Sequence, residues 1–436
     1  MTPLSWPGIL RLGLVQMALG AIVVLTTATM NRVMVVELAL PAILPGLLVS
    51  LYYGTQFLRP RFGHGADRGG RRTPWIVGGV LVLAMGAIGA ALSVWLMGSH
   101  VALGIAAAVF SFLLIGFGIG SAGTNVLALL AARVAEERRA PAGSAVWIMM
   151  IFGLALTGIA AGQVLDPYTP ARLIAVTMGV SAIAVVLALI GVWRQEGAPA
   201  GPAAERGESA PFGTVLRRLW ADREVRLFTL FIFASMLAYN LQDLILEPFA
   251  GHVFALTVGE STALGGMLHA GALAGMLVVL VSGTALARWV LVPIRVWIVG
   301  GCVVSGLALL ALAFGAQMAP AWPIAPNVFV LGLANGVFAV AAIGAMMGFA
   351  RQDARGSDTG LRMGLFGAAQ AIAFGLGAFL GTAAADITRA LMASDALAYG
   401  TVFAAEGVIF FLSAIVALRI TAPTEVPRTI AAVPGE

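Results

Sequence analysis

The stretch Gly63-His-Gly-Ala-Asp-Arg-Gly-Gly-Arg-Arg72 decides the fold of this chain, because it separates two long apolar segments. Its glycines let a loop lie close against neighbouring helix ends, and Asp67 can face the positive N-terminus of a helix. Its arginines are typical of a short loop on the cytoplasmic side of a membrane. The stretch predicts a tight turn at a membrane surface, with these candidate functional residues: Gly63, Asp67, Arg68, Gly70, Arg71 and Arg72.

The composition around this turn is that of a membrane protein. Of 436 residues, 60% are apolar and 10% are charged, and the mean hydropathy is +0.98. A soluble domain has about half apolar and a quarter charged residues, so we expect a polytopic protein in a lipid bilayer, without a cleavable signal peptide. All 25 basic residues are arginines in short loops, which indicates membrane topology and argues against nucleic acid as a partner. Cys302 is the single cysteine, which excludes an internal disulfide.

Apolar segments of about 20 residues can cross a bilayer as helices, and the chain has twelve. They cover approximately 12–36, 41–60, 74–97, 101–131, 144–165, 172–193, 227–249, 262–283, 295–316, 325–349, 362–383 and 397–419. This count places Arg32, Arg172 and Arg389 on one side and the remaining 22 of the 25 arginines on the other. The asymmetry predicts that both termini are cytoplasmic.

The pattern Gly63, Asp67-Arg68, Gly70-Arg71-Arg72 resembles the loop between helices 2 and 3 of the major facilitator superfamily. The resemblance implies an all-α fold of twelve transmembrane helices in two six-helix pseudo-repeat halves. We expect an N-terminal half over 1–193, a cytoplasmic linker over 194–226, a C-terminal half over 227–422 and a cytoplasmic tail over 423–436. Apolar residues at helical spacing between Phe212 and Trp220 predict a short amphipathic helix in the linker. That helix either joins the halves or docks a partner.

Charged and polar residues inside apolar segments are the strongest candidates for function. Segment 1 carries Arg32 and Glu37, and segment 7 carries Asn240, Asp243 and Glu247 on one helix face. In the superfamily fold these segments meet near a central cavity, so Arg32 is expected to pair with Asp243 or Glu247. The cluster can be an outer gate, a proton or substrate site, or a static bridge between the halves.

Other polar residues leave two interpretations open. His269 has small neighbours and is either a hydrogen-bonded packing residue or a ligand to the magnesium of a chlorin ring. A further set of amides either lines a cavity or bonds between helices: Gln16, Gln56, Asn125, Gln163, Asn335 and Gln370. Phosphate-loop, nucleophile-elbow and zinc-helix motifs are missing from the sequence, which argues against an enzyme, and the scattered histidines do not suggest a metal site.

Three stretches resemble a narrower family, called PucC/LhaA or the bacteriochlorophyll delivery family. They are the run from Arg11 to Leu38, the run from Arg59 to Pro74, and Gln242-Asp-Leu-Ile-Leu-Glu-Pro-Phe249. The resemblance implies a cytoplasmic or intracytoplasmic membrane of a phototrophic bacterium. It also implies assembly of light-harvesting complexes, with bound bacteriochlorophyll and with antenna polypeptides and pigment-synthesis enzymes as partners.

Three hypotheses remain on the sequence alone. The chain can be a pigment-handling assembly factor, a proton-coupled secondary transporter that uses Asp243 or Glu247, or a scaffold that binds antenna or pigment-synthesis proteins without pigment. The assembly factor predicts bound pigment, and the transporter predicts solute flux. The scaffold predicts stable protein partners with neither pigment nor flux.

Overall fold

The computed structural model describes residues 4–58, 62, 66, 71–135, 138–196, 220–284, 292–351 and 359–420. Every regular element among them is helical. Eleven of these helices are long and apolar enough to cross a membrane, and Ile43–Leu58 is a shorter apolar helix. The expected all-α polytopic fold is confirmed. The linker boundaries and the amphipathic helix of residues 212–220 stay predictions, because residues 197–219 lie outside the described part.

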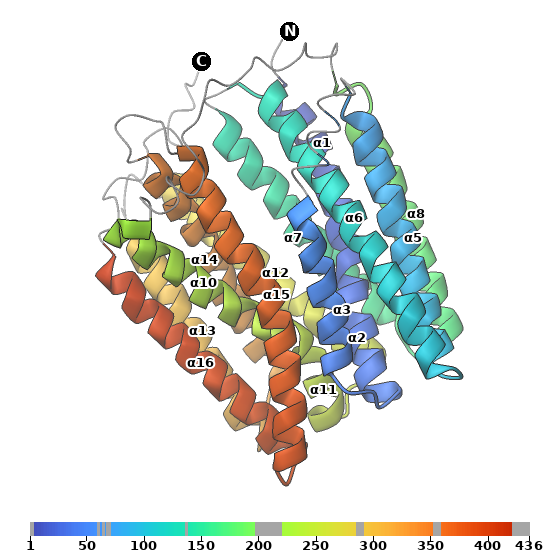
Figure 1. The fold of residues 1–436 in the computed structure, drawn as a ribbon. Helices are drawn as coiled ribbons and strands as arrows, with labels where there is room; N and C mark the ends of the chain where they lie inside the picture. The colour runs from blue at the N-terminus through green and yellow to red at the C-terminus, as the bar shows by residue number, and fades with distance from the viewer. Residues whose placement is uncertain are drawn as a thin grey trace.

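The first six crossings form one group of helices (Figure 1). The first is a continuous rod of α1 (Trp6–Val24), the π-helical η1 (Leu25–Thr29), α2 (Met30–Arg32) and the π-helical η2 (Val33–Glu37). The second is α3 (Ile43–Gly54), continued by the 3-10 turn η3 (Thr55–Leu58). The others are α5 (Thr73–Met97), α6 (Val101–Arg133), α7 (Arg139–Leu165) and α8 (Pro170–Val192).

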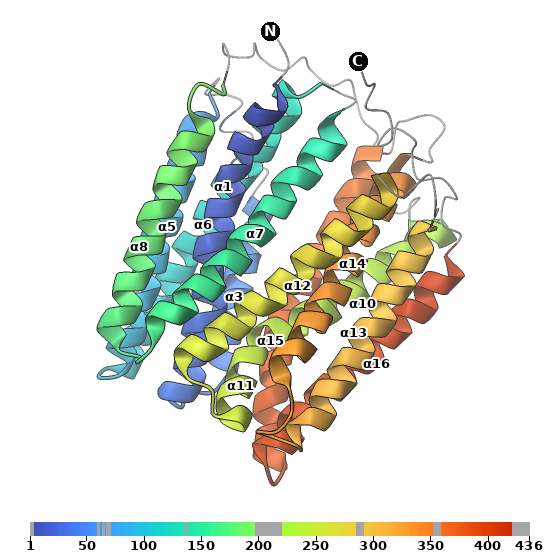
Figure 2. The same cartoon turned by 180° about the vertical axis from the view of Figure 1, so that it is seen from behind.

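The remaining six crossings form the second group (Figure 2). The seventh crossing is broken into α10 (Arg223–Leu241), the 3-10 turn η5 (Gln242–Leu244) and α11 (Leu246–Phe254). It is followed by α12 (Val258–Thr284), α13 (Ile294–Ala316), α14 (Ile324–Arg351), α15 (Thr359–Leu391) and α16 (Asp395–Arg419). Each group has its own buried apolar cluster, one around Leu12, Leu83 and Phe112 and the other around Phe231, Phe338 and Phe403.

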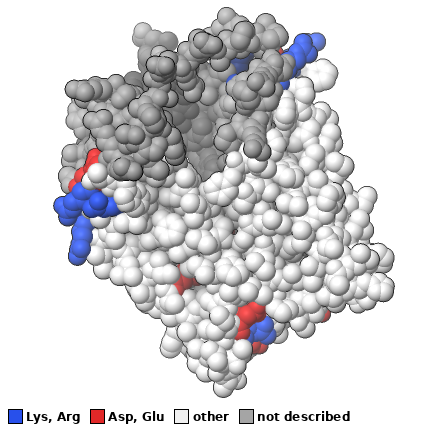
Figure 3. Space-filling model, in the orientation of Figure 1, with Lys and Arg blue, Asp and Glu red and all other residues white. Residues whose placement is uncertain are grey.

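Trp6 of α1 and Arg419 of α16 lie at the same end of the molecule, which we call the terminal end (Figure 1). The opposite end, which we call the distal end, holds the connections from α7 to α8, from α11 to α12 and from α15 to α16 (Figures 1 and 2). Much of the described surface on the face shown in Figure 3 is uncharged, with charged atoms in a few small groups. A bilayer requires such an apolar surface around the helices.

The two groups meet through α7 against α12 and α3 against α15. Glycines allow the first contact, since a Cβ on Gly158 would lie 2.7 Å from the Cα of Gly266. The helices α7 and α12 converge toward the distal end (Figure 2). In a six-helix repeat, α7 (the fifth crossing) corresponds to α15 (the eleventh), and α12 (the eighth) corresponds to α3 (the second). The two contacts are therefore related by pseudo-symmetry.

Each of these two contacts ends in a carboxylate that caps a helix of the other group. Asp386 of α15 accepts hydrogen bonds from the backbone N–H groups of Ala42, at 2.9 Å, and Ile43, at 2.8 Å, where α3 begins. Asp166, after α7, accepts from the N–H of Gly259 at 3.0 Å and from the Thr257 hydroxyl, where α12 begins. Helix N-termini carry unpaired N–H groups and a partial positive charge. We call these two contacts the distal caps.

Loss of the distal caps is expected to loosen the distal end. Thr382 is fully buried in α15, where a Cβ on Gly46 of α3 would collide with it. A Thr382→Cys probe, in a Cys302→Ala background, should therefore react slowly with a membrane-impermeant maleimide. Asp386→Ala should raise the labelling rate roughly fivefold, because a helix cap contributes about 1 kcal/mol.

The control is Asp395→Ala, which removes another carboxylate near the distal end. Asp395 pairs with Arg389 at 2.7 Å within the second group. Equal labelling rates in the Asp386→Ala and Asp395→Ala variants would show that the cap does not hold the two groups together.

Candidate functional site

A cavity of about 370 Å³ lies between the two groups of helices. Its lining residues come from α1, α3, α6 and α7 of the first group and from α10, α11, α12 and α15 of the second. Its deepest members, such as Glu247 and Gly265, lie toward the distal end, whereas Gln16, Trp147 and Gly367 lie in the terminal halves of their helices. The cavity therefore extends from the centre toward the terminal end, and the distal caps lie beyond its closed side.

Aromatic side chains form one wall of the cavity. The rings of Tyr52 and Tyr53 lie 4.4 Å apart, and Phe374 packs 5.7 Å from Tyr53 and 6.1 Å from Tyr239. Trp147 of α7, in the first group of helices, also lines the cavity. Aromatic faces at these separations present a flat apolar surface, which suits a planar ligand.

The structure places the three candidate residues of segment 7, Asn240, Asp243 and Glu247, in the cavity wall. Asn240 donates to the Phe374 carbonyl at 2.7 Å, and the Tyr53 hydroxyl lies 3.5 Å from the Asn240 amide oxygen. Asp243 and Glu247 also line the cavity. Their spacing predicted one face of a regular α-helix. The helix instead breaks at η5, between Asn240 and Glu247.

Pro248 explains why segment 7 is interrupted. Proline has no N–H, so it cannot donate to the carbonyl four residues earlier, which belongs to Leu244. The Asn31 side-chain amide of segment 1 donates to that carbonyl instead. The break in the second group is thus satisfied by a buried amide from the first group, as a lipid environment requires.

Glu247 is a buried carboxylate without a hydrogen-bond partner. It is 1% exposed, and neither carboxylate oxygen has a partner among the described residues. A Cβ on Gly265 of α12 would lie 2.6 Å from Glu247 Oε1, so the Glu247 carboxylate lies directly against this glycine. His269 is one turn farther along α12 and lines the same cavity, and the structure gives its ring no hydrogen bond to any described residue.

Arg32 pairs with Glu37. The prediction that it pairs with Asp243 or Glu247 was wrong. Its guanidinium also donates to the Leu256 carbonyl of the second group at 2.8 Å. The reason is the π-helical turn η2, because a π-turn brings residues five apart together where an α-turn joins residues four apart. Arg32 still acts electrostatically on Glu247, but no ion pair joins it to either carboxylate of segment 7, all of which are described.

The loop quoted at the outset is described only in part. Gly63, Asp67, Arg68 and Gly70 lie outside the described residues, so their roles stay predictions. Arg71 is exposed, and Arg72 is the N-cap residue that immediately precedes α5. The Glu196 carboxylate, which follows α8, accepts from the N–H groups of Arg72 and Thr73. Burial alone would raise the pKa of Glu196, but these bonds and the Arg71 charge outweigh it and lower that pKa.

The structure shows which of the six amide side chains line the cavity and which bond between helices, a distinction that the sequence left open. Gln16, Gln56 and Gln370 line the cavity. Asn125 donates to the Ser121 carbonyl at 2.9 Å, and Asn335 accepts from Ser305 at 2.8 Å, so both bond within one group of helices. Gln163 is exposed near the distal end of α7.

One buried acid, Glu406, was not among the residues predicted from the sequence. Glu406 lies in the middle of α16, is 1% exposed and has neither carboxylate oxygen paired among the described residues. The charge of Asp243 in the cavity wall acts electrostatically on Glu406. A signal existed, because an acidic residue in the centre of an apolar segment is rare.

The Arg32–Glu37 pair can be tested by coupling energies. Arg32→Met and Glu37→Gln should each lower the unfolding midpoint in detergent, and their double variant should be less destabilised than the sum, by roughly 0.5–3 kcal/mol. The same cycle between Arg32 and Asp243, with Asp243→Asn, should give a coupling near zero. A larger coupling to Asp243 than to Glu37 would contradict the pairing in the structure.

Comparisons with known proteins agree on family and fold. The sequence profile of a family described as "PUCC protein" matches residues 29–425. The chain is 46% identical to the "Bacteriochlorophyll synthase 44.5 kDa chain" of Rhodobacter capsulatus, covering 99% of this chain and 100% of that protein. It is 31% identical to "Protein PucC" of Cereibacter sphaeroides, covering 94% of this chain and 91% of that protein.

Solved transporter structures share the fold at low sequence identity. A bacterial homologue of the lysosomal transporter Spinster, in an inward-facing and unoccupied conformation, has a TM-score of 0.69 and 14% identity, over 97% of this chain and 100% of that one. A D-xylose–proton symporter has a TM-score of 0.71 and 12% identity, over 95% and 97%. The expected major facilitator superfamily fold is therefore confirmed, and the chain belongs to the PucC family of photosynthesis-related membrane proteins.

Proposed function

We propose that this protein is an assembly factor for light-harvesting complexes that binds bacteriochlorophyll and delivers it to antenna polypeptides. It would act in the cytoplasmic or intracytoplasmic membrane, with both termini cytoplasmic. Membership of the PucC family and the name of one relative, "Bacteriochlorophyll synthase 44.5 kDa chain", support a role near this pigment. Pigment-synthesis enzymes are further partners on this proposal.

One observation carries the proposal: His269 lines the central cavity with no hydrogen bond to a described residue. A neutral imidazole is a common metal ligand. A histidine whose ring nitrogens bond only within the protein could not bind the magnesium of a chlorin, whereas the ring of His269 would be free to hold it. The cavity volume of about 370 Å³ lies in the range of ligand sites, about 300–1,000 Å³. His269 would bind the metal, and the aromatic wall would face the ring.

The other cavity residues can orient such a ligand. Asn240 is already held by the Phe374 carbonyl, so its position is fixed before a ligand binds. Glu247 lies against Gly265, which is one turn of α12 from His269, and in its protonated form it can donate a hydrogen bond to a carbonyl group of the ligand. This arrangement supports binding and positioning, and the proposed role is not enzymatic. The synthase in a relative's name belongs to that relative.

A second candidate is a proton-coupled transporter of a small solute. The observation that favours it is the presence of Asp243 and Glu247 in the wall of the cavity, since intramembrane carboxylates often carry protons in transporters. In proteoliposomes, an imposed pH gradient would then drive uptake of labelled pentoses or nucleosides, the solutes named for structural neighbours. Asp243→Asn and Glu247→Gln would abolish it.

Pigment binding can be measured directly. Protein purified in mild detergent from a phototrophic membrane, with antenna subunits removed, should show a stoichiometric near-infrared chlorin band. His269→Ala should lower pigment occupancy roughly tenfold, the factor for about 1.4 kcal/mol. The control is His252→Ala, because His252 lies outside the cavity lining and contacts the Tyr399 hydroxyl at 3.0 Å.

The outcomes separate the candidates. A band that persists unchanged in His269→Ala would keep pigment binding and remove His269 as the ligand. No band in the wild type, together with gradient-driven uptake, would favour the transporter. No band and no uptake would leave a pigment-free scaffold.

A further inference from the structure

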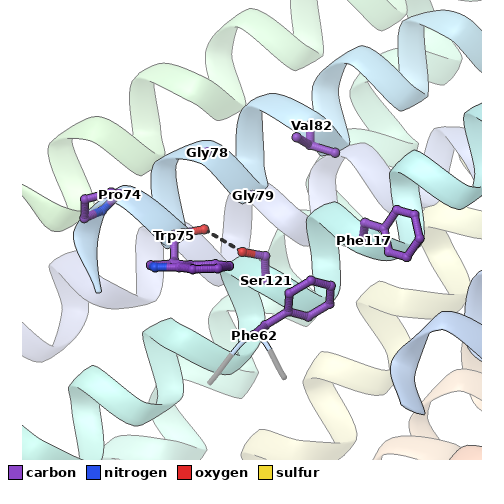
Figure 4. Close-up of a pocket in the computed structure, with 8 residues that line it drawn as sticks. All are labelled: Phe62, Pro74, Trp75, Gly78, Gly79, Val82, Phe117 and Ser121. Carbon is purple, nitrogen blue, oxygen red and sulfur yellow. Dashed lines mark hydrogen bonds between the residues drawn. The ribbon is translucent and has the colours of Figure 1, made fainter. Parts of the chain in front are cut away.

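A second cavity of about 320 Å³ forms a groove on the surface of the first group of helices (Figure 4). Five of its lining residues are on α5, namely Pro74, Trp75, Gly78, Gly79 and Val82. Phe117 and Ser121 of α6 and the ring of Phe62 complete it, and the rings of Phe62 and Phe117 lie 6.4 Å apart. The lining is almost entirely apolar.

The groove faces away from the central cavity. On α6, the central cavity is lined by Ile119, Gly123 and Leu127. Phe117 and Ser121 each lie two residues from Ile119, which is about 200° around an α-helix. The groove therefore opens on the opposite face of α6, toward the bilayer.

Glycines set the depth of the groove. A Cβ on Gly79 would lie 2.6 Å from the backbone nitrogen of Ala122, so α5 and α6 touch there. A Cβ on the adjacent Gly78 would meet no heavy atom within 4 Å, so the space above Gly78 is open. The Ser121 hydroxyl, which is buried in the lining of the groove, donates to the Trp75 carbonyl at 2.9 Å. The floor accordingly needs no polar partner.

The dimensions of the groove fit a single hydrocarbon chain. From Pro74 to Val82 the helix rises about 12 Å, far less than the about 30 Å that a transmembrane helix of a protein partner would cover. An acyl chain is flexible and thin enough to lie along such a short groove between three rings. A bilayer surrounds these helices and supplies acyl chains directly.

Basic side chains lie at the terminal end of the groove. The exposed Arg71 and the half-buried Arg72 immediately precede α5, one turn from Trp75. Arginines at a membrane surface attract anionic lipid headgroups. We propose that this groove binds one acyl chain of an anionic phospholipid, whose headgroup lies beside Arg71 and Arg72.

The test uses nanodiscs that contain a phosphatidylglycerol with a photoactivatable diazirine on one acyl chain. After illumination, mass spectrometry of peptides should place labels on residues 74–82 and 117–121. A Cβ at Gly78 lies in open space, so Gly78→Leu should place its side chain in the groove and reduce this labelling roughly threefold or more. The matched control is Gly179→Leu on α8, where a Cβ also meets nothing within 4 Å.

A second arm tests the headgroup. The same diazirine chain on phosphatidylcholine should label the groove less than phosphatidylglycerol does, and Arg71→Gln should reduce the difference between the two lipids. The proposal is overturned if Gly78→Leu and Gly179→Leu label equally, or if the two headgroups label equally. It is also overturned if only a photoactivatable isoprenoid alcohol labels the groove, because that would assign it to a different class of chain.

Discussion

The structure depends on one constraint: inside a bilayer, a backbone N–H or C=O group that leaves a helix must find a partner within the protein. The helices of this chain begin or break at several interior points, and the two groups of helices satisfy one another there. Asp386 caps α3, Asp166 caps α12, and Asn31 satisfies the carbonyl that Pro248 leaves free. All three contacts lie at or beyond the deep end of the cavity. The polar bonding between the groups is thereby concentrated on one side, and the cavity occupies the other.

Against this background, the unpaired groups in the cavity are informative. An unsatisfied buried polar group costs free energy, and native structures retain few of them. Glu247 has no partner among the described residues, because Arg32 of the first crossing pairs with Glu37 instead. His269, one turn of α12 from Gly265, also lines the cavity and also has no hydrogen bond to a described residue. Groups left unpaired on the wall of a cavity are suited to a ligand that supplies their partners, which supports binding in the proposed function.

The sequence predicted the topology better than the contacts. The length of the apolar segments and the placement of the arginines determine how a chain crosses a bilayer. The helices, and the location of the start of α1 and the end of α16 at one end, could therefore be predicted. The partner of Arg32 could not, because it depends on a π-turn that a spacing of three or four residues does not reveal. Asp386 and Glu196 were also beyond reach, because each caps a helix more than 100 residues away. Glu406 could have been found by its position alone.

The distal caps bear on the choice between pigment delivery and solute transport. A transporter that alternates access must open its distal end, and this would expose the N–H groups of Ala42, Ile43 and Gly259 together with two carboxylates. Those groups would need water or new partners in every cycle. A pigment whose hydrocarbon tail stays in the bilayer can enter and leave between helices, and its carrier never has to break these bonds. Strong caps are therefore compatible with pigment delivery, whereas solute transport requires caps weak enough to open repeatedly.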